Sequence, residues 1–594
     1  MKLNKFLLSA IAAASLTACS DSPEIVDNNK GHWNADGTGY VSLSISMPDN
    51  VGSKGSRANN DKFEKGDDNE YAIKNATLVI FSGDKDDETS MTIEAAYDLP
   101  LSFTTVGGDD DQIISKGKLT KQIDKITKTY AKALVILNKP TGFEVVNNNT
   151  VKNDLQYNGA TYKGKSFTEF QALKSKLDVN VANGFTMTNA PLTKGQSSST
   201  AIPTTGKTTT LATINKENIK PTAEEASNNP AATIYVERSV AKVTVNNNTG
   251  ATPSITTNTN IKYNIDGYVL DNTNTTSYIV RNADETSSWY NLKSKSASVS
   301  GSDQYRFIGT SPVYGASQDG KGGYYRTYWA KDPNYTNLAG QTGQAKVGLE
   351  TKTTYTTFTS INEASYCMEN TFDVANQTQE NTTRAILKVQ MWTGEDGNKG
   401  HTYYMYNDDA TTFTDNLASA ANNIVNSLAG VPSGTTVQEV GLEDLVNGKA
   451  KIEYIKINSG ATEVSDGNIF ESLKKYFGDI TVYTNGYAYY PVLIKHFGDD
   501  LTPWNDQNKP EWTTQPSTTK IYPGTDDERN ANYLGRYGVV RNNWYELKIN
   551  SVKRPGSPVI NPPSPTPDDE LDSYISVSIN ILSWAKRSQD VDLQ

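Results

Sequence analysis

The sequence predicts a mainly β protein with two folded domains and tails that lie outside them. At 594 residues the chain is too long for one ordinary core. Its 33 Tyr residues, its abundant Thr and Asn, and an apolar content of 36% are typical of a β-rich extracellular protein. In several short stretches, apolar and polar residues alternate, which is the pattern of half-buried strands.

Charge and composition exclude several classes of function. The net charge of −11 argues against nucleic-acid binding, because phosphate neutralisation needs clustered Lys and Arg. With two cysteines and three histidines the chain has no CxxC or HExxH site, so we expect no metal centre and no cofactor. No motif selects a catalytic residue. The acidic clusters around Asp84 and Asp110 are read as solvated turns, with calcium binding as the alternative.

Residues 1–19 are predicted to be a lipoprotein signal peptide. Lys2 and Lys5 precede a short apolar run, and the segment Leu16–Cys19 reads Leu-Thr-Ala-Cys, which resembles a bacterial lipobox. Cys19 is therefore expected to be lipidated and to hold the precursor at a membrane. This leaves Cys367 without a disulfide partner, so we expect it to be a small buried residue.

Residues 20–57 are predicted to be a propeptide that contains one strand. Pro48 ends that strand, and the following loop carries Lys54 and Arg57 in a Gly-, Ser- and Asn-rich context that proteases favour. The strand's apolar face consists of Val41, Leu43, Ile45 and Met47.

Residues 58–232 are predicted to form the N-terminal domain. Residues 76–81 and 133–138 are short, apolar and bounded by turn residues, as buried strands are. Ser166 and Glu169 have the spacing of a capping box. Phe170, Leu173 and Leu177 follow at helical spacing, so a helix of about three turns is expected there.

Residues 233–556 are predicted to form the C-terminal domain. Apolar positions change from even to odd numbers around Glu237 to Val240, which indicates a bulge or a change of sheet. The remaining predicted elements are strands at 401–406, 487–494 and 542–552 and helices at 417–428 and 469–477.

Residues 557–594 are predicted to be a Pro-rich linker and a second end strand. The linker should be extended and should keep the strand from turning back onto its own domain. The strand alternates as the first one does, and apolar residues continue beyond it: Ile575, Val577, Ile579, Ile581, Trp584, Val591 and Leu593.

The two similar end strands suggest strand addition between copies of the chain. A lone strand needs a sheet edge. The N-terminal strand could complete its own subunit until a cut near Arg57 releases it, and the C-terminal strand of another copy could then take its place. Such a head-to-tail contact does not close and builds a filament. The alternative is that both ends pack within one chain and that their similarity is chance.

Several segments resemble the fimbrillin shaft subunits of type V pili, closest to the minor-fimbria (Mfa-type) fimbrillins. Besides the lipobox and the Arg57-Ala58 loop, these are YVERSVAKVTV, YYPVLIKHF, YGVVRNNWYELKINSVKRPG and the ending SWAKRSQDVDL. The resemblance implies two transthyretin-like Greek-key β-sandwiches and export as a lipoprotein. It also implies a cut between Arg57 and Ala58 by an Arg-specific, trypsin-like surface protease, followed by donor-strand exchange.

The same resemblance implies a place at the cell surface. The precursor would be anchored in the outer membrane by its lipid, and the mature chain would form a fimbrium that supports adhesion and biofilm formation. Its expected partners are other copies of itself, accessory anchor and tip subunits, the protease, and host or bacterial receptors. The alternative function is a monomeric surface lipoprotein or a pilus-tip adhesin that binds glycan or a host protein.

Overall fold

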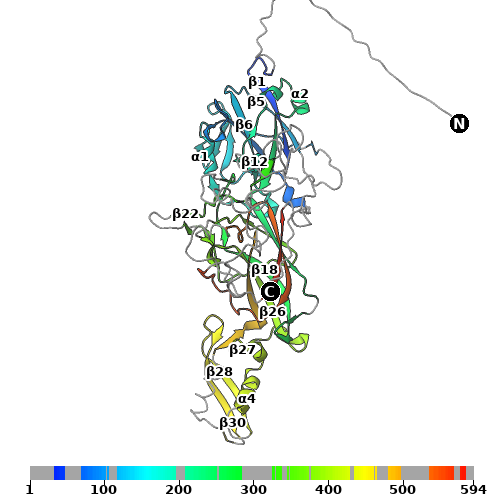
Figure 1. The fold of residues 1–594 in the computed structure, drawn as a ribbon, viewed down its shortest axis with the longest axis vertical. Helices are drawn as coiled ribbons and strands as arrows, with labels where there is room; N and C mark the ends of the chain where they lie inside the picture. The colour runs from blue at the N-terminus through cyan, green and yellow to red at the C-terminus, as the bar shows by residue number, and fades with distance from the viewer. Residues whose placement is uncertain are drawn as a thin grey trace, which may run out of the picture.

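The fold is mainly β, and the sequence-based prediction is confirmed in this respect. Three units follow one another along the long axis of the molecule: a first domain, a second domain and a small third unit at the end opposite the first (Figure 1). The computed structural model describes residues 32–46, 68–101, 104–105, 117–194, 208–250, 253–283, 324–327, 329–337, 344–346, 348–372, 376–427, 434–459, 462–463, 479–496, 534–566 and 575–583.

The first domain is built on a nine-stranded sheet that includes the N-terminal strand. Its order is β3-β2-β6-β11-β15-β1-β5-β4, and β14 pairs with β6. The strands are β1 (Thr38–Ser46), β2 (Ala76–Gly83), β3 (Thr92–Asp98), β4 (Thr104–Thr105), β5 (Gly117–Asp124), β6 (Tyr130–Leu137), β11 (Met187–Asn189), β14 (Ala212–Thr213) and β15 (Ala232–Arg238).

This sheet folds over on itself and encloses one core. Side chains from β1 and β5 pack in the same apolar cluster as side chains from β2, β3 and β6. Both predicted buried segments, 76–81 and 133–138, belong to this sheet as β2 and β6. A second cluster covers the other face of β2 and β6 and includes residues of the three-stranded sheet β7 (Phe143–Val146), β8 (Asp154–Tyr157) and β9 (Ala160–Thr161).

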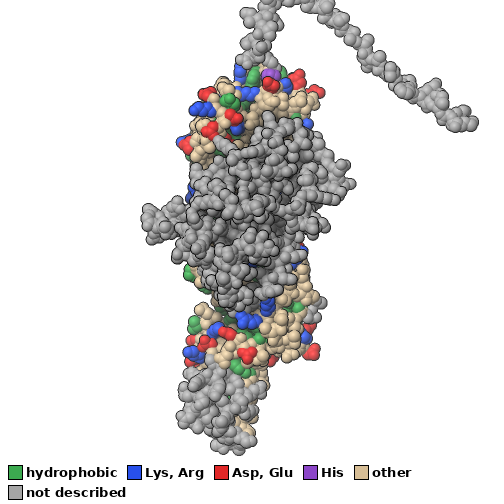
Figure 2. All heavy atoms as spheres, viewed as in Figure 1, with side chains coloured by type: hydrophobic (Ala, Val, Ile, Leu, Met, Phe, Trp, Pro, Cys, Tyr) green, Lys and Arg blue, Asp and Glu red, His purple; other side chains and the backbone are tan. Residues whose placement is uncertain are grey.

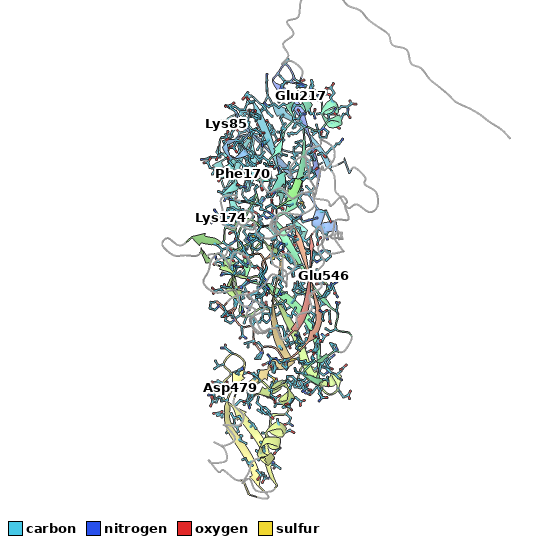
Figure 3. The ribbon with its side chains drawn as sticks, viewed as in Figure 1. Lys85, Phe170, Lys174, Glu217, Asp479 and Glu546 are labelled. Atoms are coloured by element: carbon cyan, nitrogen blue, oxygen red, sulfur yellow. The ribbon has the colours of Figure 1, made fainter. Side chains whose placement is uncertain are left out.

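Helix α1 (Phe167–Gln171) is shorter than the sequence predicts. Its capping box is confirmed, because Ser166 accepts from the Glu169 N–H and Glu169 accepts from the Ser166 N–H. Phe170, which is labelled in Figure 3, is fully buried, and its ring makes an edge-to-face contact with the ring of Phe81. The three-turn length is wrong, because the chain leaves the helix and pairs β10 (Lys174–Ser175) with β20 (Ser277–Tyr278). Strand pairing across the domain junction overrides the helical spacing of Leu173 and Leu177.

The change of apolar phase around residue 239 is a change of sheet. Strand β15 stays in the first sheet, and β16 (Val240–Asn247) opens the second domain. Ser239 between them is fully buried, and its N–H donates to the Thr186 carbonyl at 2.9 Å. The chain therefore passes from the first sheet to the second domain after β15, and the sequence-based boundary at 232/233 falls after the first residue of that strand.

The second domain is a sandwich of two four-stranded sheets. Inward side chains of both sheets, among them Val243, Leu547, Tyr263 and Leu387, share one core. One sheet has the order β25 (Ala364–Met368), β16, β34 (Asn543–Val552) and β35 (Ile575–Ser583). The other has the order β17 (Ser254–Ile255), β18 (Asn258–Asp271), β26 (Arg384–Thr393) and β33 (Tyr487–Leu493).

A small third unit is inserted between β26 and β33, which the sequence analysis did not separate from the second domain. The helix predicted at 417–428 is present as α4 (Leu417–Ser427) and packs on the hairpin of β28 (Thr435–Leu442) and β30 (Ile452–Ser459). Strands β27 (Tyr403–Tyr406) and β32 (Ile480–Tyr483) connect it to the sandwich. The helix predicted at 469–477 lies outside the described residues.

Cys367 is buried in β25, as predicted, with 2% of its surface exposed. Burial raises the pKa of its thiol to about 12. We expect the folded chain starting at Ala58 to resist a thiol-specific reagent at neutral pH and to react with it after unfolding in guanidinium. Absorbance of the released reporter group measures this, and labelling of the native chain at the unfolded rate would contradict it.

The described surface carries charges of both signs. Lys and Arg side chains are interspersed with Asp and Glu on the face in Figure 2. In the acidic cluster around Asp84, the carboxylates of Asp84 and Asp86 pair with Lys128 and Lys132, each at 2.9 Å. The second cluster, 109–111, lies outside the described residues. Among the helices that are described, none has the length and apolar character to span a bilayer.

Candidate strand-exchange site

Strand β1 lies in the interior of the first sheet and pairs with a neighbour on each side. It runs antiparallel to β5, where Thr38 to Ile45 face Asp124 to Gly117 in unbroken register. It runs parallel to β15, where Leu43 to Ser46 face Ala232 to Tyr235. We call this position, between β5 and β15, the β1 site. Without β1, two strands that are not hydrogen-bonded to each other would face an open gap.

The inward face of β1 supplies part of the first core. Val41 and Leu43 are fully buried and Ile45 is 3% exposed, and all three pack in the main cluster of the first domain. Burial of three aliphatic side chains contributes about 5–9 kcal/mol before the cost of ordering the strand. The β1 site is therefore an apolar slot as well as a gap in the hydrogen-bond ladder.

The opposite face of β1 is also covered. Ser42 is fully buried and accepts a hydrogen bond from the Thr120 hydroxyl at 3.2 Å. Helix α2 (Ala223–Asn228) packs over β1 and β5 on this side, and Lys118 of β5 donates to its Ser227 carbonyl. Helix α2 was not predicted from the sequence, although Thr222 and Glu225 have the spacing of a capping box.

Truncation of Leu43 should destabilise the uncut chain. We expect Leu43→Ala to lower its free energy of unfolding by about 2–5 kcal/mol, because it leaves a cavity among fully buried neighbours. Urea unfolding followed by circular dichroism measures this. The matched control is Ser44→Ala on the outer face, for which we expect a change within about 0.5 kcal/mol. If Leu43→Ala lowered the free energy of unfolding by no more than Ser44→Ala does, Leu43 would not be part of the core.

The chain that follows β1 is fastened at the domain junction. The first described element after β1 is the 3-10 turn η1 (Asp68–Tyr71), where Glu70 is fully buried. Its carboxylate pairs with Lys242 at 2.6 Å and accepts from the Tyr366 hydroxyl at 2.5 Å, and its carbonyl accepts from Arg238. A chain cut at Arg57 would therefore keep its new N-terminal segment attached near residue 70.

Further buried ion pairs hold the two domains together. Glu237 of β15 pairs with Arg281 at 2.8 Å, and both side chains are fully buried. Arg541 pairs with Glu369 and donates to Ser277 and Tyr278, which lie beside the first domain. Separating the two domains would leave these buried charges without partners, which is strongly destabilising. These ion pairs therefore favour a fixed arrangement of the two domains. These ion pairs were not predicted, because the sequence alone does not reveal that these charged residues are buried.

The C-terminal strand is docked on its own chain. Strand β35 pairs antiparallel with β34 at the edge of the second sandwich, with Ile575 opposite Val552 and Ile581 opposite Tyr545. Val577 and Ile579 face Ile549 and Leu547. The expectation that the Pro-rich run would keep this strand from its own body is wrong. The structure also does not bring the two end strands together, because β1 belongs to the first domain.

The described part of the Pro-rich run explains how the strand returns. Main-chain contacts fix it to the second domain: Ser557 pairs with Tyr489, and the carbonyls of Asn561 and Thr566 accept from Arg384 and from the Gln379 N–H. The run is laid along the domain before the chain continues to β35.

The other predicted site residues lie outside the described residues. They are Cys19, Met47, Arg57, Ala58, Trp584, Val591 and Leu593.

Residues 520–590 match the family model described as "Major fimbrial subunit protein type IV, Fimbrillin, C-terminal". The C-terminal region is therefore similar to the C-terminal region of fimbrillins. The matched residues include β34, the Pro-rich run and β35, and the resemblance drawn from the sequence is confirmed there.

Solved structures give looser similarities over most of the chain. A candidate cell adhesion protein from Parabacteroides distasonis is 13% identical, with 92% of this chain and 98% of that one covered and a TM-score of 0.34. A fimbrilin (fimA) from Porphyromonas gingivalis is 14% identical, with 92% of this chain and 99% of that one covered and a TM-score of 0.33. The C-terminally truncated tip fimbrial protein Mfa3 from Porphyromonas gingivalis is 12% identical, with 92% of this chain and 100% of that one covered and a TM-score of 0.28. No match was found among curated proteins.

Proposed function

We propose that this chain is a structural shaft subunit of a surface fimbrium and that its copies polymerise by donor-strand exchange. The observation that carries this is the place of β1, an interior strand of the first sheet. The segment that follows it in the sequence contains Arg57, where we propose that a protease cuts. The fimbrillin C-terminal region supports the same function. The role is non-enzymatic and involves no cofactor.

The proposed maturation has three steps. Cys19 is lipidated, and the precursor is held at the outer membrane. An Arg-specific surface protease then cuts after Arg57, which leaves Val41, Leu43, Ile45 and Met47 on a peptide that is no longer joined to the body. The C-terminal strand of another copy then enters the vacated β1 site, in a polymer with accessory anchor and tip subunits.

The docking of β35 on β34 favours a second candidate function, because a chain with both ends docked is self-complete. That candidate is a monomeric surface lipoprotein or a tip adhesin that binds glycan or a host protein. In the shaft proposal the same pairing belongs to the precursor, and β35 leaves β34 when it is exchanged.

Limited trypsin treatment of the purified precursor separates the two candidates. The shaft proposal expects one early cut after Arg57, verified by N-terminal sequencing, followed by a ladder of oligomers on unboiled SDS gels. The same protein mixed with inactivated trypsin should stay monomeric. A chain that is cut at Arg57 and still remains a monomer at high concentration would overturn the shaft proposal in favour of the monomeric one.

A further inference from the structure

The β1 site has two positions that restrict the side chain of any strand that fills it. Gly39 is buried, and a Cβ there would lie 2.9 Å from Ile219 Cγ2 and 2.9 Å from the ring of Trp33. Trp33 precedes Arg57 and would leave with the propeptide, but Ile219 belongs to the body. Ser42 is fully buried beside Thr120 on the face that α2 covers. Both positions therefore favour a small residue.

These two positions restrict how the C-terminal strand can fit. A shift by one residue would turn its apolar face outward, so only even shifts are acceptable. If Ser578 replaced Ser42, Ile575 would replace Gly39 and press on Ile219. If Tyr574 replaced Ser42, an aromatic ring would fall where a hydroxymethyl group is already fully buried. With Ser576 in the place of Ser42, Ser573 replaces Gly39. Its Cβ still requires the Ile219 side chain to shift, but serine is smaller than the Ile575 or Leu571 that the other two alignments place there.

The same alignment gives the best agreement of the two segments in sequence. In this alignment residues 39–47 and 573–581 lie opposite each other. The first segment reads Gly-Tyr-Val-Ser-Leu-Ser-Ile-Ser-Met and the second Ser-Tyr-Ile-Ser-Val-Ser-Ile-Asn-Ile. The apolar residues coincide, as do a tyrosine and two of the serines. The half-buried positions Tyr40 and Ser44 then receive Tyr574 and Ser578.

We propose that an incoming C-terminal strand fills the β1 site in this single register and in the direction of β1, with residues 573–581 in place of 39–47. The inference rests on the proposed function and extends it, because it names the specificity-determining contacts of the exchange. The partner is a second copy of this chain, and Ser576 is the residue of the donor that fixes the register at Ser42.

Cysteine pairs across the acceptor strand β5 test the register. Ser44 faces Lys118 in β5, so the proposal places Ser578 of the donor opposite Lys118 of the acceptor. In the variant Lys118→Cys/Ser578→Cys, we expect a ladder of disulfide-linked oligomers after cleavage at Arg57. It should form about tenfold faster than with Ser576→Cys or Asn580→Cys as the donor cysteine, because a disulfide needs close Cα atoms. Cleavage removes Cys19, and Cys367 is buried.

A second cysteine pair tests whether β35 is docked on β34 of its own chain. Ser578 faces Lys548 when β35 lies on β34. In Lys548→Cys/Ser578→Cys, we therefore expect an intramolecular disulfide that prevents oligomers until a reductant is added. This pair uses the same donor cysteine, so it checks that residue 578 tolerates the substitution.

The outcomes distinguish the register from the exchange itself. A ladder formed best with Asn580→Cys or Ser576→Cys would overturn the register and leave the proposed function standing. If no pair with Lys118→Cys gives intermolecular links, while the cleaved Lys548→Cys/Ser578→Cys variant still forms its intramolecular disulfide, the proposed exchange fails, and the register fails with it.

As an independent measure, Ser576→Leu should abolish oligomers, whereas Ser578→Leu should leave them detectable because position 44 is only half-buried.

Discussion

Deletion of residues 574–594 is expected to give a folded chain that is cut after Arg57 and forms no filaments. The deletion removes β35, which lies at the edge of the second sandwich. The inward residues of β34, Tyr545, Leu547 and Ile549, are fully buried in the core and remain in place. Electron microscopy and unboiled SDS gels measure the loss of polymer, and circular dichroism measures the retained fold.

Mixing the truncated chain with the intact chain supplies the control. The truncated subunit still has a β1 site and can accept a donor, but it offers no donor of its own. In a head-to-tail polymer such a subunit ends growth, so filaments should become shorter as its share increases. Full-length filaments made of the truncated chain alone would contradict the role given to the C-terminal strand.

The variant Arg57→Ala is expected to stay a monomer when it is treated with an Arg-specific protease that polymerises the wild type, because such a protease does not cut at Lys54. In the uncut chain, β1 is covalently joined to the body that holds its site, which gives it an effective concentration on the order of mM. A donor strand from another copy cannot compete with it at ordinary protein concentrations. Size-exclusion chromatography after treatment measures the fraction of oligomer.

Lys54→Ala is the matched control for that variant. Lys54 lies in the same stretch and is also basic, so trypsin could cut there, whereas an Arg-specific protease would not. Lys54→Ala should polymerise as the wild type does. Arg57→Ala with wild-type amounts of oligomer would show that the cut at Arg57 is not the trigger.

The sequence could predict the elements whose residues follow a simple period. The alternation at Val41 to Ile45 identified β1, and the apolar runs identified β2 and β6. The change of phase near Glu237 identified the point where the chain leaves one sheet for another. In each case a single period over a few residues reports which face is buried.

Contacts between distant segments could not be predicted in this way. The helical spacing of Leu173 and Leu177 continues past the end of α1, but pairing with residues 277–278 decides the backbone there. Glu70, Glu237 and Arg238 are residue types usually found at the surface, and only their partners far along the chain make their burial possible. The third unit was not separated from its host domain, although both helices predicted for that domain fall between β26 and β33 in the sequence.

The hydrogen-bond ladders on both sides of β1 also bear on mechanical strength. The bonds of an antiparallel pair run perpendicular to the strands. Tension along a strand held in this position loads these bonds in shear, so that many must rupture together, whereas peeling breaks them one at a time. Subunits linked through such a strand would resist a pulling force such as fluid flow better than subunits whose contact can be peeled apart from one end.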